Sequence, residues 1–125
     1  MSNKIYTPNA PEAIGPYSQA VTAGNLVFTS GQIAINPASG AVEATTMEEQ
    51  THQVCKNLTA VLEAAGSSLE KVVKTVCFLA DMNDFAAFNA VYATYFTGKP
   101  ARSCVAVKTL PKGVLVEIDT IAEID

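Results

Sequence analysis

An arginine stands in an otherwise apolar segment near the C-terminus, ARSCVAVK (101–108). With the two-residue period of a β-strand, Arg102, Cys104 and Ala106 share one face of this segment. A guanidinium in such a setting is suited to bidentate binding of a ligand carboxylate or phosphate. An edge-strand arginine that reaches solvent, or that pairs with Asp119, fits the pattern equally well. The segment is therefore a candidate anion site with a structural alternative.

A carboxylate occupies a comparable place in the next apolar segment. Glu117 lies among aliphatic residues and shares an alternating face with Asp119. If the two segments form a hairpin that closes about residues 110–111, Cys104 faces Glu117 and Arg102 faces Asp119. A carboxylate on that patch could orient a water molecule or carry a proton. Spacing alone favours the simpler interpretation, in which Glu117 is a solvated strand residue or neutralises the arginine.

The cysteines and the histidine limit the chemistry further. A guanidinium beside Cys104 would lower its thiol pKa, but no histidine is placed as a base, so a packing and backbone-donor role fits Cys104 better. Three cysteines (Cys55, Cys77 and Cys104) without a C-x-x-C pair favour neither a disulfide framework nor a zinc site. His52 is the one histidine and is expected on the surface, so neither a Ser-His-Asp triad nor a metal site is supported.

Four other positions could contact a ligand. Tyr17 follows a Gly-Pro turn that can fix an aromatic ring, although packing of its own loop is the simpler explanation. Ser30 and Gly31 interrupt the strand pattern FTSGQI, where glycine is typical of a bulge or of a close backbone approach. Asn89 falls on the apolar side of an expected helix, so its amide needs a partner, either a ligand or a backbone group.

Hydrophobic periodicity predicts the elements that position these residues. From Thr46, apolar residues recur at spacings of three and four, and Thr46 with Glu49 forms a capping-box pattern, so a helix should run to Gly66. A second helix should begin near Phe85 and end before Gly98. Strands are expected at 20–23, 26–35, 72–80, 101–108 and 114–124, after a short strand within 1–19. This order predicts a single α+β domain spanning residues 1–125.

The strand at 72–80 suggests a partner. Its sequence, VVKTVCFLA, is apolar at both alternating sets of positions, so both of its faces should be covered. Two helices can cover only one face of a sheet this wide. The other face therefore needs a partner, most simply another copy of the chain.

The composition excludes several classes of function. Hydrophobic residues make up 49% and charged residues 16% of the 125 residues, which is too apolar for a disordered chain. The net charge is −4 without any Lys/Arg run, so the electrostatic signature of nucleic-acid binding is missing. No apolar run approaches the ~18 residues of a membrane span, and the proline-interrupted start is unlike a signal peptide. We expect a cytoplasmic protein that binds neither nucleic acid nor membranes.

Taken together, the strings AIGPYSQA, FTSGQI, KNLTAVLEAAG, PARSCVAV and LPKGVLVEI resemble the RidA (YjgF) family of imine and enamine deaminases. The resemblance runs nearly end to end and keeps the order of the blocks. It implies a chorismate-mutase-like two-layer sandwich, in which a mixed β-sheet carries two helices on one face. It also implies a homotrimer with substrate clefts between neighbouring subunits, and chemistry that requires no metal or organic cofactor.

The resemblance further implies a reaction and a site. Members of the family hydrolyse 2-aminoacrylate and 2-aminocrotonate, through their imines, to 2-keto acids and ammonia. Arg102 matches the arginine that binds the substrate carboxylate, and Glu117 matches the glutamate that positions the attacking water. The substrate-binding set comprises Arg102, Ser103, Cys104 (through its backbone N–H), Tyr17, Ser30, Gly31 and Asn89. Relatives described as endoribonucleases or translation inhibitors offer one alternative, and a non-catalytic metabolite-sensing or chaperone-like protein offers another.

Overall fold

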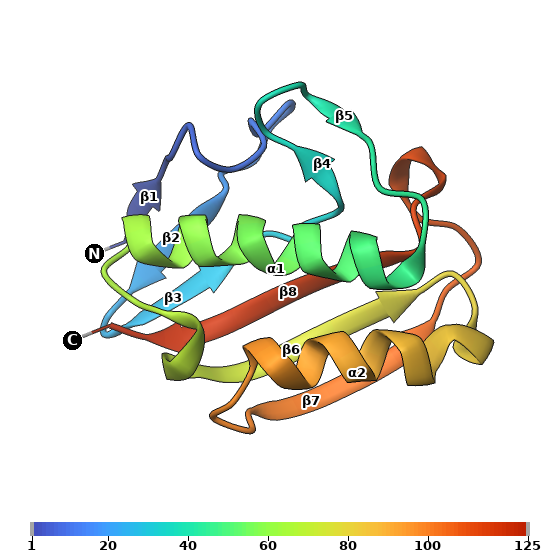
Figure 1. Cartoon of the computed structure of the whole chain (residues 1–125). Coiled ribbons are helices and arrows are strands. Elements are labelled where there is room, and N and C mark those ends of the chain that lie inside the picture. The colour runs from blue at the N-terminus through green and yellow to red at the C-terminus, as the bar shows by residue number, and fades with distance from the viewer. Residues whose placement is uncertain (1, 125) are drawn as a thin grey trace.

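Six strands form one mixed sheet in the computed structural model, which describes residues 2–124 (Figure 1). Neighbouring strands are antiparallel except for β6 (Val72–Leu79) and β7 (Ala101–Ala106), which are parallel. A separate two-stranded sheet pairs β4 (Ile35–Asn36) with β5 (Ala41–Val42). In spatial order the large sheet contains β1 (Asn3–Ile5), β2 (Ala20–Ala23), β3 (Leu26–Thr29), β8 (Val116–Glu123), β6 (Val72–Leu79) and β7 (Ala101–Ala106).

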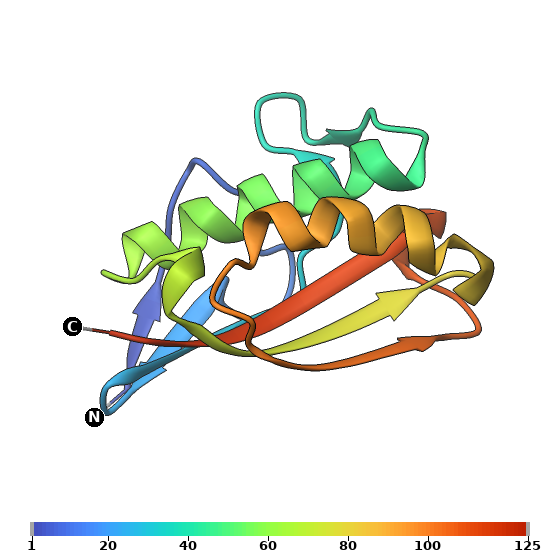
Figure 2. The ribbon, with the colours of Figure 1, turned by 60° about the horizontal axis from the view of Figure 1, so that its bottom comes forward.

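Two helices, α1 (Met47–Ala64) and α2 (Phe85–Tyr95), cover one face of the large sheet, as Figure 2 shows. The predicted capping box is present at the start of α1, where the Thr46 side chain accepts a hydrogen bond from the Glu49 amide at 3.2 Å. Three short 3₁₀ turns lie at η1 (Leu69–Lys71), η2 (Met82–Asp84) and η3 (Pro111–Gly113). The α+β architecture with two helices on one face of a mixed sheet is therefore confirmed. No helix within residues 2–124 has the length and apolar character needed to cross a membrane.

The face of the sheet opposite the helices, here called the open face, carries apolar side chains. Phe78 of β6 pairs with Glu117 of β8 on one side and with Val105 of β7 on the other. Phe28 on β3 projects from the same face. Phe28 remains 40% exposed and Val105 47% exposed. The expectation that two helices leave one apolar face of the sheet uncovered within a single chain is therefore correct.

The predicted hairpin between residues 101–108 and 114–124 is wrong, because β6 lies between β7 and β8. The register pairs Thr75 of β6 with Arg102 on one side and with Thr120 on the other. β6 is apolar at most positions, and as an inner strand it has hydrogen-bonded neighbours along both edges. The loop before β8 passes the end of β6, where the Ala80 amide bonds to the Leu115 carbonyl at 3.0 Å.

The predicted strand at 26–35 ends early, at Thr29. The chain rejoins the sheet only at Gln32, which forms a bridge with Ile118. The pairing moves from Phe28 to Gln32 along this segment, a difference of four in residue number, but only from Ile121 to Ile118 on β8, a difference of three. The one extra residue forms a β-bulge. The bulge directs Gly31 toward the side chains at the start of β8.

Candidate active site

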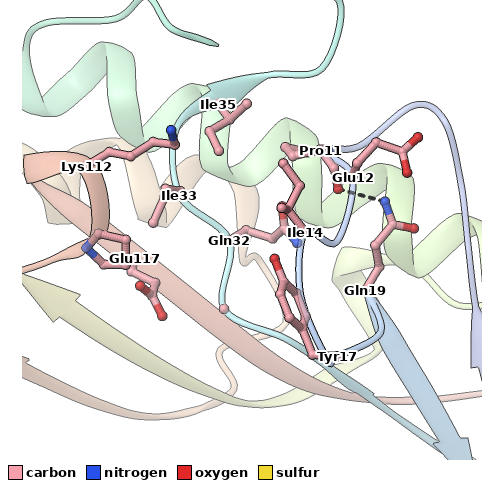
Figure 3. Close-up of a pocket in the computed structure, with 12 residues that line it drawn as sticks. Pro11, Glu12, Ile14, Tyr17, Gln19, Gln32, Ile33, Ile35, Lys112 and Glu117 are labelled. Carbon is pink, nitrogen blue, oxygen red and sulfur yellow. Dashed lines mark hydrogen bonds between the residues drawn. The ribbon is translucent and has the colours of Figure 1, made fainter. Parts of the chain in front are cut away.

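Glu117 lines a cavity of about 500 Å³, here called the Glu117 hollow (Figure 3). Its walls come from the loop before β2, from the segment after β3 and from η3. In Figure 3 Glu117 and Tyr17 lie on either side of the segment that carries Gln32. The lining residues are Pro11, Glu12, Ile14, Tyr17, Gln19, Gly31, Gln32, Ile33, Ile35, Pro111, Lys112 and Glu117.

The negative charge of the Glu117 carboxylate has little stabilisation from its own chain. It is half-buried, and within residues 2–124 no group donates a hydrogen bond to it. Burial raises the pKa of Glu117, and the neighbouring carboxylate of Asp119 raises it further. A carboxylate with a raised pKa is a stronger base at neutral pH, so Glu117 is suited to accept a proton from water.

Gln19 fixes the N-terminal wall of this hollow. Only 2% of Gln19 is exposed, and its Oε1 accepts a hydrogen bond from the Thr7 amide at 2.7 Å. Its Nε2 donates to the Thr7 carbonyl at 3.0 Å and to the Pro11 carbonyl at 2.8 Å, the latter drawn in Figure 3. Tyr6 adds a hydrogen bond from its hydroxyl to Glu12 at 2.7 Å. The buried hydrogen bonds of Gln19 hold this irregular segment in one conformation.

Arg102 lines a second hollow, of about 620 Å³, between β7 and the C-terminal half of α2. We call it the Arg102 hollow. The Arg102 Nη1 donates to Asn89 Oδ1 at 2.7 Å, and the guanidinium carbon lies 4.7 Å from the ring centroid of Tyr92 and 5.4 Å from that of Phe85. The Tyr92 hydroxyl is in turn hydrogen-bonded to Thr75 at 2.8 Å.

The contacts of Arg102 orient its charge without neutralising it. Its partners are a neutral amide and two aromatic rings, and no carboxylate of the described chain forms an ion pair with it. The alternative pairing with Asp119 does not occur, because Asp119 lies on β8 with its side chain on the open face. An oriented, exposed guanidinium without a counterion is suited to bind an anion.

The structure places the candidate residues in two separate groups. Tyr17, Gly31 and Glu117 line the Glu117 hollow, whereas Asn89 and Arg102 line the Arg102 hollow. Paired residues of neighbouring strands project to the same side, so Arg102 lies on the helix side with Thr75, and Glu117 lies on the open face with Phe78. The single patch expected from a hairpin is therefore wrong: in one chain the guanidinium and this carboxylate are on opposite faces.

The remaining candidate residues have lesser roles in the two hollows. The Ser30 hydroxyl donates to the Ser18 carbonyl at 2.6 Å, which anchors the bulge. Ser103 pairs with Val76 and projects to the open face. Burial raises the pKa of the Cys104 thiol more than the nearby Arg102 lowers it, so the net pKa is raised and the thiol is not activated as a nucleophile. Within the described part of the chain, no group of three or more His, Cys, Asp or Glu side chains could hold a metal ion.

Among the residues of the two hollows that the sequence does not predict as candidates are Tyr92, Lys112 and Gln19. Tyr92 follows Asn89 by about one helical turn, and this spacing is a usable signal. Lys112 lies in the turn before β8, and Gln19 has no local pattern that distinguishes it from a surface glutamine. Their roles depend on contacts with segments distant in the sequence.

Comparisons with known proteins agree with this architecture. Residues 7–124 match the family model described as endoribonuclease L-PSP. A RutC family protein of Pyrococcus horikoshii is 54% identical over 123 residues, which cover 98% of each chain. The 2-iminobutanoate/2-iminopropanoate deaminase of Escherichia coli is 50% identical over 126 residues, again covering 98% of each chain. The crystal structure of the YjgF gene product of E. coli has a TM-score of 0.92 at 47% identity, covering 97% of this chain and 98% of that chain.

Replacing Gln19 should loosen the N-terminal wall. Gln19→Leu removes the partner of the buried Thr7 amide and the donor to three carbonyls, those of Thr7, Ala10 and Pro11, so we expect a loss of roughly 2–4 kcal/mol in the free energy of unfolding. Amide hydrogen exchange at Thr7 should accelerate. Lys56→Leu on the exposed side of α1, where no side-chain hydrogen bond within residues 2–124 is lost, is the control, for which a change within about 0.5 kcal/mol is expected. Unchanged exchange at Thr7 in Gln19→Leu would contradict the anchoring role.

Glu117→Gln should stabilise the protein at neutral pH. The pKa of Glu117 is higher in the folded chain than in the unfolded one, so the folded state loses stability as pH rises through that interval. The amide carries no charge and avoids this loss. Thermal unfolding of single chains, measured at a concentration too low for association, should therefore give Glu117→Gln a higher Tm than wild type at about pH 7. The difference should vanish below about pH 4, where both states bind the proton. If Glu117→Gln still had a higher Tm than wild type at acidic pH, the stabilisation would have a cause other than the charge of Glu117.

Proposed function

The chain belongs to the RidA (YjgF) family, and on this premise we propose that it hydrolyses small 2-imino acids to 2-keto acids and ammonia. The observation that carries the proposal is the guanidinium of Arg102, which Asn89 and Tyr92 orient but no carboxylate of the described chain neutralises. Such a group fits the carboxylate that every 2-imino acid carries. The E. coli relative named as a deaminase of this type supports the same reaction.

We further propose that the working site forms between copies of the chain, in a homotrimer. Arg102 and Glu117 lie on opposite faces of the sheet, so a small substrate that touches both must bridge two chains. The Arg102 hollow of one copy would meet the Glu117 hollow of its neighbour. The exposed apolar side chains of the open face supply the surface that association would bury.

In the proposed reaction Arg102 binds the substrate carboxylate through two hydrogen bonds, with the backbone N–H of Cys104 beside it. This places C2 of the protonated imine next to a water molecule held by Glu117. As the water oxygen bonds to C2, Glu117 takes one of its protons, which gives a tetrahedral amino alcohol. Glu117 then returns the proton to the nitrogen, and the C–N bond breaks as the hydroxyl oxygen forms the C=O bond of the 2-keto acid. The hydroxyl proton passes through Glu117 to the departing ammonia, which leaves as ammonium. One water is consumed for each ammonia released.

Two further proposals concern location and alternatives. We propose a cytoplasmic location, where enzymes that use pyridoxal phosphate release 2-aminoacrylate and 2-aminocrotonate. The endoribonuclease alternative suits this chain less well, because its net charge is −4 and Arg102 is its only arginine. A non-catalytic metabolite sensor would bind a 2-keto acid in the same cleft without turnover, so measured turnover separates the two.

Replacing Arg102 and replacing Glu117 should impair imine hydrolysis in different ways. With threonine dehydratase supplying 2-aminocrotonate, Arg102→Ala should lower kcat/KM about 10- to 100-fold through lost carboxylate binding. Glu117→Gln should lower kcat about 100-fold or more and leave 2-ketobutyrate binding nearly intact. Lys108→Ala, which removes an exposed positive charge outside both hollows, is the control. Equal rates of 2-ketobutyrate release with wild type and Arg102→Ala would refute the deaminase, and salt-sensitive RNA cleavage would favour the nuclease.

The assembly is tested separately by mass. Sedimentation of the wild type should give three times the 13.1 kDa of one chain. Val105→Glu places a charge on the open face and should yield single chains without imine hydrolysis, because a buried unpaired charge costs several kcal/mol. Ala86→Glu adds the same charge on the exposed side of α2 and should leave the trimer intact. A wild-type mass of one chain would contradict the shared site.

A further inference from the structure

The Glu117 side chain lies directly against Gly31, in the space that another residue's Cβ would occupy. An ideal Cβ built on Gly31 would overlap Glu117 Oε2 and lie 2.9 Å from Cδ and 3.1 Å from Cγ. Every other amino acid carries this atom, so the carboxylate could not remain where it is with any residue except glycine at position 31.

The backbone does not itself require glycine here. Gly31 is outside the left-handed region, unlike Gly15, Gly24 and Gly40, so alanine could adopt its conformation without strain. The requirement at Gly31 is therefore steric, and it comes from the Glu117 side chain.

The bulge segment cannot easily move away from Glu117. On one side of Gly31 the Ser30 amide donates to the Gln19 carbonyl at 2.9 Å. On the other side Gln32 and Ile118 exchange two backbone hydrogen bonds of 2.8 and 3.1 Å. An added methyl group would consequently displace the flexible Glu117 side chain, because the anchored backbone costs more to move.

We propose that Gly31 is a positioning residue, whose missing side chain leaves the space that holds the Glu117 carboxylate against the backbone of the bulge. This role acts through Glu117 and differs from simply lining a pocket. Its kinetic consequence rests on the proposed imine hydrolysis, whereas its structural consequence does not.

The electrostatic surroundings predict what displacement would do. Asp119 flanks Glu117 on β8, and Glu12, Tyr17 and Lys112 line the same hollow. Burial is the largest cause of the raised pKa of Glu117. A carboxylate pushed off Gly31 into the hollow would lose part of this desolvation, and it would come nearer to the Arg102 that the proposed trimer places across the hollow. Both changes lower the pKa of Glu117.

The first test measures the carboxylate without any turnover. The pKa of Glu117 is followed by ¹³C NMR titration in wild type, in Gly31→Ala and in Gly40→Ala, which adds a methyl group in open space at the β4–β5 turn. We expect a lower pKa in Gly31→Ala and the wild-type pKa in Gly40→Ala, even if both variants lose stability. An unchanged pKa in folded Gly31→Ala overturns the proposal.

The second test is a double-mutant cycle on imine hydrolysis, with Gly31→Ala, Glu117→Ala and the double variant. Gly31→Ala alone should lower kcat about tenfold or more with little change in KM, because Glu117 is displaced while Arg102 still binds the substrate carboxylate. In the Glu117→Ala background the same substitution should cost less than about twofold, since nothing is left to displace. If Gly31→Ala lowers kcat by the same factor with and without Glu117, the proposal is overturned. If the wild type hydrolyses no imine, the proposed function fails, and the NMR titration still decides the role of Gly31.

Discussion

The insertion of β6 between β7 and β8, combined with the alternation of side chains along a strand, separates Arg102 from Glu117. Thr75 and Phe78 of β6 pair with these two residues and project to opposite faces. A slip of one residue would turn every side chain of a strand to the other face and bury the wrong set, so the arrangement cannot adjust locally. The proposed site, which uses both charges, would therefore come from more than one chain, and the apolar open face would supply the contact between chains.

Each hollow holds one charge that its own chain leaves uncompensated. Arg102 is restrained by the ring of Tyr92 and the amide of Asn89, which fix its direction and leave its charge available. Glu117 is desolvated beside another carboxylate, which raises its pKa. The desolvation of Glu117 costs folding stability, and in the proposed reaction this cost prepares the carboxylate to act on a ligand, a common trade-off in binding and catalytic sites.

The rest of the molecule holds these groups still. Gln19, buried and bonded to Thr7 and Pro11, fixes the loop that closes one side of the Glu117 hollow. The bulge after β3 places Gly31 where the Glu117 side chain needs space. Irregular backbone is thus held by buried polar groups with satisfied hydrogen bonds, which restrain the loop residues that line the hollow.

Both helices, the α+β class and most strands followed from the sequence, because capping boxes, helical spacing and alternation are local signals. The same signals identified Arg102, Glu117, Gly31 and Asn89 as candidates. The order of strands in the sheet could not be read, since alternation shows which residues of one strand share a face but not which strand lies beside it. Only the tertiary structure therefore decided that β6 separates the two charges, and that the strand expected to reach residue 35 breaks after Thr29. Those outcomes depend on hydrogen bonds and steric contacts between segments far apart in the chain, for which a linear pattern carries no signal.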